Sequence, residues 1–231
     1  VLRALRAAVV GSGPAISVGM PTRSVDAAAH PASREVPAGT AVVVTTSGSS
    51  GVPKSVMLSR SALTSSALST AARIGEGAWL LALPASYVAG LQVLVRSLVQ
   101  GHEPAILSGK FTAEAFAATA LGMTSSVGGT RAPSYTSLVP AQLGTLLDAA
   151  PHDPSVADAI LIGGQALPAA MATRADELGV KIVRTYGSSE TAGGCIYDGV
   201  PLDGVRVREV DGELQLGGPT LADGYLDAPE L

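Results

Sequence analysis

Strand-like and helix-like segments alternate along much of this chain, and this alternation constrains its fold more than any other feature. The clearest unit has a strand pattern at 159–163, a helix pattern at 168–178 and a second strand pattern at 181–185. A strand, a helix and a strand in this order typically form a parallel pair with a covering helix. The sequence therefore predicts an α/β fold with parallel-strand-containing sheets covered by helices.

Similar patterns precede this unit. We expect strands at 41–46, 79–83, 104–107 and 135–139, and helices at 1–9, 61–72, 90–100, 112–120 and 141–149. Pro140 fits the first position of the last of these helices, where a missing N–H costs nothing. The Gly-, Ser- and Thr-rich stretch 122–133 is expected to be a mobile loop.

The pattern changes after Gly194. Two segments of alternating polarity, 205–210 and 213–216, flank Asp211-Gly212, and Asp-Gly between such segments is a strong hairpin signal. We therefore expect an α/β nucleotide- and acyl-binding core at 1–193. An antiparallel sheet or barrel portion of the same domain should follow at 194–231.

Composition excludes several classes of protein. A net charge of −4 argues against a general nucleic-acid-binding protein. The uncharged run 78–95 is interrupted by proline, glycine and polar residues, so no membrane insertion is expected. The single cysteine, Cys195, forms no internal disulfide and fits a cytoplasmic protein. We expect it to be a small buried apolar residue rather than a thiol nucleophile.

A loop suited to phosphate follows the apolar run 41–44. Its residues are Thr45-Thr46-Ser47-Gly48-Ser49-Ser50-Gly51-Val52-Pro53-Lys54. Glycines let the backbone approach an anion, hydroxyl and N–H groups donate to phosphate oxygens, and the lysine supplies positive charge. Pro53 stands where a Walker A loop has glycine, so a standard P-loop is excluded. The alternative is a polar turn between a strand and a helix that begins near Ser59.

A second polar motif, Tyr186-Gly187-Ser188-Ser189-Glu190, ends a predicted parallel strand. Ligands of open α/β sheets bind at the carboxyl ends of parallel strands. Mg²⁺ prefers carboxylate and phosphate oxygens, which makes Glu190 a candidate metal ligand. The alternative for Glu190 is a solvated loop carboxylate.

Together these motifs closely resemble those of the acyl-adenylate-forming superfamily. The loop departs from the family pattern at Ser55, where glycine is usual, and Ser189 replaces a threonine of the second motif. The resemblance implies catalytic roles for Lys54, Ser189 and Glu190, with Glu190 holding Mg²⁺. It also implies an ATP-binding set comprising Thr46, Ser47, Gly48, Ser49, Ser50, Gly51, Lys54, Gly163, Gly164, Gln165, Tyr186, Gly187 and Ser189.

The segment 83–90 resembles the superfamily loop at the acyl pocket, with Tyr87 in place of a histidine. His30, His102 and His152 lie outside every motif and are expected on the surface. Arg96 follows in an apolar helix, where a charge is either at a solvent edge or buried with an anionic partner. Guanidinium matches carboxylate geometry, so Arg96 could hold a second carboxylate of a substrate. The expected substrate-binding residues are Tyr87, Gly90, Arg96 and Ser137.

Within the superfamily, segments 90–97, 135–143 and 184–195 look most similar to the o-succinylbenzoate–CoA ligase family of menaquinone biosynthesis, in an actinobacterial form. This implies adenylation of a small carboxylic acid by ATP with Mg²⁺, then transfer to coenzyme A. Another acyl- or aryl-CoA ligase, an adenylation domain and a non-catalytic adenine-nucleotide-binding module stay open, as does a homodimer. The chain corresponds to the N-terminal domain of the family. We therefore expect the small mobile domain and its lysine to be absent, leaving little ligase activity.

Overall fold

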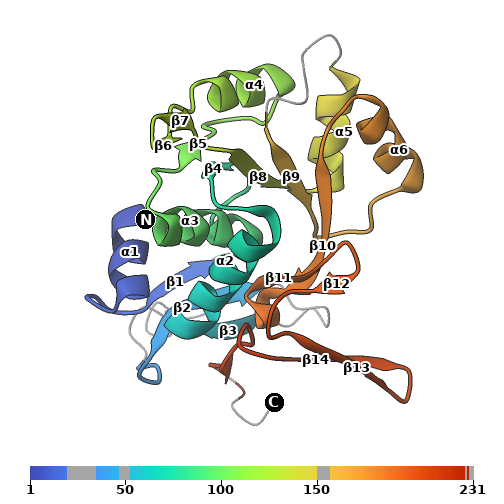
Figure 1. Cartoon of the computed structure of the whole chain (residues 1–231). Helices are drawn as coiled ribbons and strands as arrows, with labels where there is room; N and C mark the ends of the chain where they lie inside the picture. Colours follow the sequence, from blue (N-terminus) through green and yellow to red (C-terminus); the bar gives the residue numbers. More distant parts are fainter. Residues whose placement is uncertain (20–34, 47–52, 150–156, 227, 229–231) are drawn as a thin grey trace.

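The computed structural model describes residues 1–19, 35–46, 53–149, 157–226 and 228. Within these ranges the strands form a seven-stranded sheet, a four-stranded sheet and two sheets of two strands. Three helices, α1 (Leu2–Val10), α2 (Arg60–Ile74) and α3 (Val88–Gln100), lie between the two larger sheets (Figure 1). The predicted α/β class is confirmed.

The seven-stranded sheet contains the predicted parallel strands. Its order is β12-β11-β10-β9-β8-β4-β5. The parallel strands are β4 (Ala78–Leu81), β5 (Ala105–Ile106), β8 (Ser134–Leu138), β9 (Ala159–Ile162) and β10 (Ile182–Ser188). The edge strands β11 (Gly193–Tyr197) and β12 (Val200–Pro201) are antiparallel.

Both faces of this sheet are buried, as expected for parallel strands. Alternate residues of one strand join different hydrophobic clusters: Leu161 packs with α2 and α3, whereas Ile160 and Ile162 pack with the helices of the opposite face. Those helices are α4 (Ala113–Leu121), α5 (Pro140–Asp148) and α6 (Ala169–Glu177). Pro140 is the first residue of α5, as predicted.

The four-stranded sheet was only partly predicted. Its order is β1 (Ile16–Gly19), β2 (Thr40–Thr46), β3 (Lys54–Ser59) and β15 (Gly224–Tyr225). No strand was predicted between the phosphate-loop motif and the helix expected to begin near Ser59, and β3 corrects this. The chain returns as β3, antiparallel to β2, before Ser59 caps α2 by accepting a hydrogen bond from Ala62 N. The phosphate-loop motif therefore joins two antiparallel strands.

The chain after residue 193 contributes to three sheets. The strands β11 and β12 extend the seven-stranded sheet, and β15 joins the four-stranded one. The predicted hairpin is confirmed as β13 (Arg206–Val210) and β14 (Glu213–Gly217). Asp211 and Gly212 between them have φ of 52° and 82°, the left-handed conformation that such turns require.

The expectation of a mobile loop at 122–133 is wrong in part. It contains a short hairpin of β6 (Ser126–Val127) and β7 (Thr130–Arg131), connected through Gly128 and Gly129 at positive φ. The glycine pair that suggested a loop is the turn of this hairpin.

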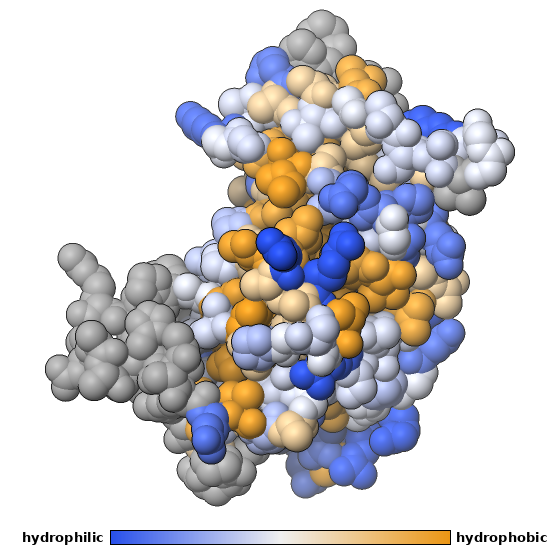
Figure 2. Space-filling model, turned by 90° about the vertical axis from the view of Figure 1, so that its left-hand side faces the viewer, coloured by the Kyte–Doolittle hydropathy of each residue, from blue (hydrophilic) through white to orange (hydrophobic). Residues whose placement is uncertain are grey.

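Within the described ranges no helix is long and apolar enough to cross a bilayer. Apolar side chains are interspersed with polar ones on the face that includes α1 (Figure 2).

Asp158, directly before β9, links the start of this strand to the start of β8 by hydrogen bonds. Its carboxylate accepts hydrogen bonds from Ser134 N at 2.7 Å and Ser134 Oγ at 2.8 Å, and Arg131 Nη2 lies 3.6 Å away. Burial opposes ionisation, but the Ser134 bonds and the Arg131 charge outweigh it, and the pKa of Asp158 falls below its ordinary value.

We expect Asp158→Asn to destabilise the fold in a pH-dependent way. A depressed pKa in the folded state stabilises at neutral pH, and this contribution is lost as pH falls through the folded-state pKa. The gap in unfolding free energy between wild type and variant should therefore be largest near pH 7 and shrink in acid. Urea unfolding across this range measures it, with exposed Asp176→Asn on α6 as the control. A gap independent of pH would contradict the assignment.

Candidate functional site

A cavity of about 110 Å³ lies at the carboxyl ends of β8, β9 and β10, beside α3. Such an end of a parallel sheet is where ligands of open α/β folds bind. Its wall combines apolar residues, five glycines and a few polar side chains. The polar side chains are those of Gln92, Arg96, Ser137, Thr185 and Tyr197.

Arg96 is the charged residue of this cavity, and its side chain is only 3% exposed. Its Nη1 donates to Ser137 Oγ at 3.4 Å, and its Nη2 donates to the Tyr197 hydroxyl at 3.2 Å. The guanidinium carbon lies 4.7 Å from the centroid of the Trp79 ring. Of the two positions expected for Arg96, a solvent edge or a buried site, the structure has the buried one.

Nothing acidic balances this charge within the part of the chain that the structure describes. The ion pairs found there do not include Arg96, and Arg96 Nε has no hydrogen-bond partner. Burial lowers the pKa of Arg96, and only Tyr197 acts in the opposite direction. A buried, unpaired charge is costly, so the site favours an anionic ligand.

Gln92 lies one turn before Arg96 on α3, on the same side of the helix. It is fully buried, and its Nε2 donates to the carbonyl of Ala192 at 2.7 Å. Because a carbonyl only accepts, and only the NH2 end of the Gln92 amide can donate, this bond fixes the amide orientation. Gln92 Oε1 has no partner among the described residues, so the cavity also offers an acceptor. Gln92 is not among the predicted site residues, because nothing in the sequence distinguishes it from other polar residues of a helix.

Two of the predicted substrate-binding residues lie elsewhere. The described lining of the cavity includes Arg96 and Ser137 but neither Tyr87 nor Gly90. Tyr87 precedes α3 and is 53% exposed. A Cβ on Gly90 would meet the backbone of Pro84 and Leu83. Gly90 is therefore required for packing of α3 against the preceding loop.

The ends of the phosphate-loop motif meet across the β2–β3 ladder. Thr46 and Lys54 are directly paired residues. Ser47, Gly48, Ser49, Ser50 and Gly51 lie outside the described residues. Lys54 Nζ is 5.0 Å from the centroid of the Tyr225 ring. The positive charge of Lys54 therefore lies beside β15, the strand that pairs with β3.

Glu190 lies in the turn that links β10 to β11, a single 3₁₀ turn at Ser189–Thr191. Its Oε1 accepts a hydrogen bond from the Tyr225 hydroxyl at 3.0 Å. Burial opposes its ionisation, but hydrogen bonds from Ser188, its own backbone and Tyr225, together with the Lys54 charge, lower its pKa. The structure thus brings Lys54 and Glu190 into one cluster around Tyr225.

Tyr225 is the member of this cluster that sequence reasoning missed. Tyr225 is not among the predicted site residues, and nothing in the sequence links it to Glu190. The link arises because β15 pairs with β3, and Ala222 N also donates to the Glu190 carbonyl at 2.7 Å.

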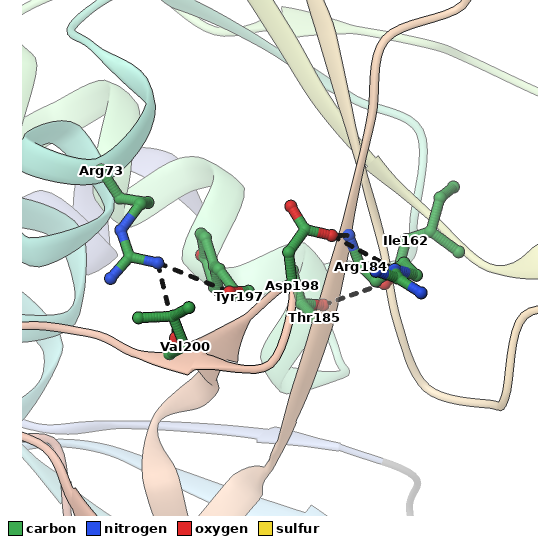
Figure 3. A network of polar contacts seen from close by, with 7 residues as sticks. All are labelled: Arg73, Ile162, Arg184, Thr185, Tyr197, Asp198 and Val200. Atoms are coloured by element: carbon green, nitrogen blue, oxygen red, sulfur yellow. Dashed lines mark hydrogen bonds and ion pairs between the residues drawn. The ribbon is translucent and has the colours of Figure 1, made fainter. Parts of the chain in front are cut away.

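The remaining ATP-binding candidates lie at the ends of β9 and β10. Gly163, Gly164 and Gln165 follow β9 directly, and Tyr186 is 55% exposed. A Cβ on Gly163 would collide with Thr185 Oγ1. Thr185 Oγ1 itself donates to the Ile162 carbonyl at 3.1 Å, and Figure 3 shows this bond joining the two strands.

Cys195 has the buried position that the sequence predicted for it, whereas His102 is less exposed than expected. Cys195 is fully buried, and burial raises the pKa of its thiol. A buried neutral thiol is a poor nucleophile. His102 is half-buried after α3, whereas His30 and His152 lie outside the described residues.

In the cluster around Tyr225, Glu190 is the described carboxylate that could bind a magnesium ion. The described residues contain no group of three or more His, Cys, Asp or Glu side chains that could hold a metal. Mg²⁺ bound through one or two carboxylates and the phosphates of a nucleotide is a common arrangement. The ionised Glu190 beside Lys54 fits this donor set.

Comparison with known proteins identifies the family. Residues 6–226 match the AMP-binding enzyme family. The chain belongs to this family. It is 44% identical over 230 residues to a probable 2-succinylbenzoate–CoA ligase of Mycobacterium tuberculosis, covering 97% of this chain and 58% of that protein. The chain therefore spans a little over half the length of this AMP-binding relative.

Solved structures agree with the fold. Wild-type Escherichia coli MenE, with a bound m-phenylether-linked analogue of OSB-AMS, aligns with a TM-score of 0.67 at 29% identity, over 80% of this chain and 40% of that one. Bacillus subtilis o-succinylbenzoate coenzyme A synthetase, in complex with ATP and magnesium ion, aligns over 100% of this chain and 56% of that one. Its TM-score is 0.73 at 21% identity, which supports the AMP-binding fold.

Proposed function

We propose that this chain forms the nucleotide- and acyl-binding part of an AMP-forming o-succinylbenzoate–CoA ligase of menaquinone biosynthesis, working in the cytoplasm. The observation that carries the substrate assignment is Arg96, which is buried in the cavity and has no acidic partner among the described residues. o-Succinylbenzoate is a dicarboxylate, so one carboxylate can react while the other pairs with Arg96. The names of the relatives support the same substrate.

The proposed reaction has two steps. The succinyl carboxylate attacks the α-phosphorus of ATP, an acyl-adenylate forms and pyrophosphate leaves. The thiol of coenzyme A then attacks the acyl carbon and AMP leaves, which gives the thioester. Mg²⁺, when bound, would neutralise phosphate charge.

The chain's own residues would bind and orient the reactants. Lys54 would pair with phosphate oxygens, and Thr46 with the loop Ser47–Gly51 would donate hydrogen bonds to them. Ser189 would donate to the α-phosphate, and Glu190 would hold Mg²⁺. Tyr186 would cover the adenine against the backbone of 163–165. Arg96 and Ser137 would orient the ring carboxylate, which brings the succinyl carboxylate toward ATP.

Calorimetry with this 231-residue chain tests the proposal. ATP with Mg²⁺ and o-succinylbenzoate should each bind, because Lys54 and Glu190 form one cluster around Tyr225 and Arg96 lies in the cavity. Benzoate is the matched control for the acid and should bind much more weakly. Failure of o-succinylbenzoate to bind better than other aryl and acyl carboxylates would favour a different acyl-CoA ligase. Failure of every adenine nucleotide to bind folded protein would overturn the family function as a whole.

Glu190→Gln should weaken ATP binding in the presence of Mg²⁺ more than AMP binding without metal. The amide keeps the shape and can still accept from Tyr225, but it lacks the charge that Mg²⁺ prefers. We expect a loss of roughly tenfold or more for ATP with Mg²⁺, comparable with one charged contact. Calorimetry with and without EDTA measures the difference. Equal losses for both nucleotides would remove Glu190 from the metal site.

A further inference from the structure

We infer that Tyr197 and Thr70 are positioning residues for Arg96: they hold the guanidinium in place through neutral hydroxyls and leave its charge free for a ligand carboxylate. This inference rests on the proposed function, in which Arg96 binds the second carboxylate. Neither residue belongs to a motif of the sequence analysis. Tyr197 is on β11 and Thr70 on α2, and both are buried.

The direction of each hydrogen bond in this chain of contacts can be assigned. Thr70 Oγ1 donates to the Ser66 carbonyl at 2.8 Å, so its one proton is engaged. It therefore accepts at the 2.9 Å contact with the Tyr197 hydroxyl. Tyr197 in turn donates its one proton to Thr70 and presents only lone pairs to Arg96 Nη2, 3.2 Å away. The backbone of α2 thus orients the acceptor that faces Arg96.

Tyr197 itself is held firmly. Its side chain is 1% exposed. Its carbonyl accepts from Arg73 Nη1 at 3.4 Å, and Arg73 also reaches the Val200 carbonyl, as Figure 3 shows. The same helix therefore fixes both the backbone and the hydroxyl of Tyr197.

The chemistry of the support explains its use at this position. An aspartate or glutamate would orient Arg96 equally well but would cancel its charge. A phenol accepts a hydrogen bond and carries no charge, so the guanidinium stays available to an incoming carboxylate. On its other sides Arg96 meets the Trp79 ring and the Ser137 hydroxyl, which are also neutral.

The test compares two acids that differ only in the group Arg96 would bind. o-Succinylbenzoate has a ring carboxylate, and 4-oxo-4-phenylbutanoate has the same succinyl chain without it. Tyr197→Phe should weaken o-succinylbenzoate binding roughly tenfold, the size of one hydrogen bond to a charged group. Binding of 4-oxo-4-phenylbutanoate should be unchanged. In an Arg96→Leu background, Tyr197→Phe should have no further effect on either acid.

Thr70 supplies a matched pair of variants that does not depend on Tyr197→Phe folding. Thr70→Val removes the hydroxyl at nearly constant shape and should weaken o-succinylbenzoate binding, whereas Thr70→Ser should restore it. Equal losses for both acids, or the same loss without Arg96, would show a merely structural role and overturn the inference. If wild type did not prefer o-succinylbenzoate over 4-oxo-4-phenylbutanoate, the proposed function would fail instead. Calorimetry gives the affinities, and thermal unfolding confirms that each variant is folded.

Discussion

Arg96→Leu is expected to weaken o-succinylbenzoate binding about 100-fold, which corresponds to about 3 kcal/mol. The variant loses the only charged group in the described lining of the cavity. ATP affinity should not change, because Arg96 makes no contact with Lys54 or Glu190. Calorimetry with each ligand separates the two effects.

Stability provides a second measurement on the same variant. Replacing a buried charge that has no partner with an apolar side chain of similar volume is often neutral or stabilising. Arg96→Leu should therefore unfold at the same urea concentration as wild type or a higher one. Arg96→Lys is the control: it keeps a charge but loses the planar fork, and should bind the dicarboxylate at an intermediate level. A marked loss of stability together with unchanged binding would make Arg96 a structural residue.

Gly187→Ala is expected to have the largest effect on stability, a loss of about 3 kcal/mol or more. A Cβ at this position would collide with the Gly193 carbonyl oxygen and lie 2.8 Å from Gly194 Cα. Both are backbone atoms of β11, so no side chain can move aside. The collision falls where the β10–β11 register shifts, between Tyr186 and Gly187.

Urea unfolding of Gly187→Ala should show the loss directly. The control is Gly144→Ala within α5, where the new Cβ would meet only the end of Met171 at 3.4 Å. Alanine is a better helix former than glycine, so this change should be neutral or stabilising by up to about 1 kcal/mol. If the two variants had equal stability, the close approach of β10 and β11 would be wrong.

The sequence was sufficient where one residue pattern decides one element. The βαβ unit, the Asp211-Gly212 hairpin and the position of Pro140 were all predicted, because periodicity and turn chemistry are local. The strand β3 was missed because its apolar residues, Val56 to Leu58, are few and directly precede a helix. Short apolar runs of this kind do not distinguish a strand from the start of a helix.

The site residues, like the strands, could be predicted only where a local pattern indicates them. The motifs indicated Lys54, Glu190 and Arg96, whose residue types carry charge. Tyr225, Tyr197 and Gln92 could not be predicted, because their roles depend on contacts between residues far apart in the chain, 35 residues in the case of Tyr225 and Glu190. Gly187 was assigned to nucleotide binding, yet the contact with β11 already requires glycine there.

Glu190 lies in a turn between two strands of the seven-stranded sheet. Its carboxylate is bound by Tyr225 on β15 of the four-stranded sheet, and its carbonyl by Ala222 just before β15. Opening either sheet would therefore separate Glu190 from Lys54. Local unfolding that leaves one sheet intact would leave no nucleotide site. A bound nucleotide would thus protect amides of both sheets from hydrogen exchange together, and make them a single cooperative unit.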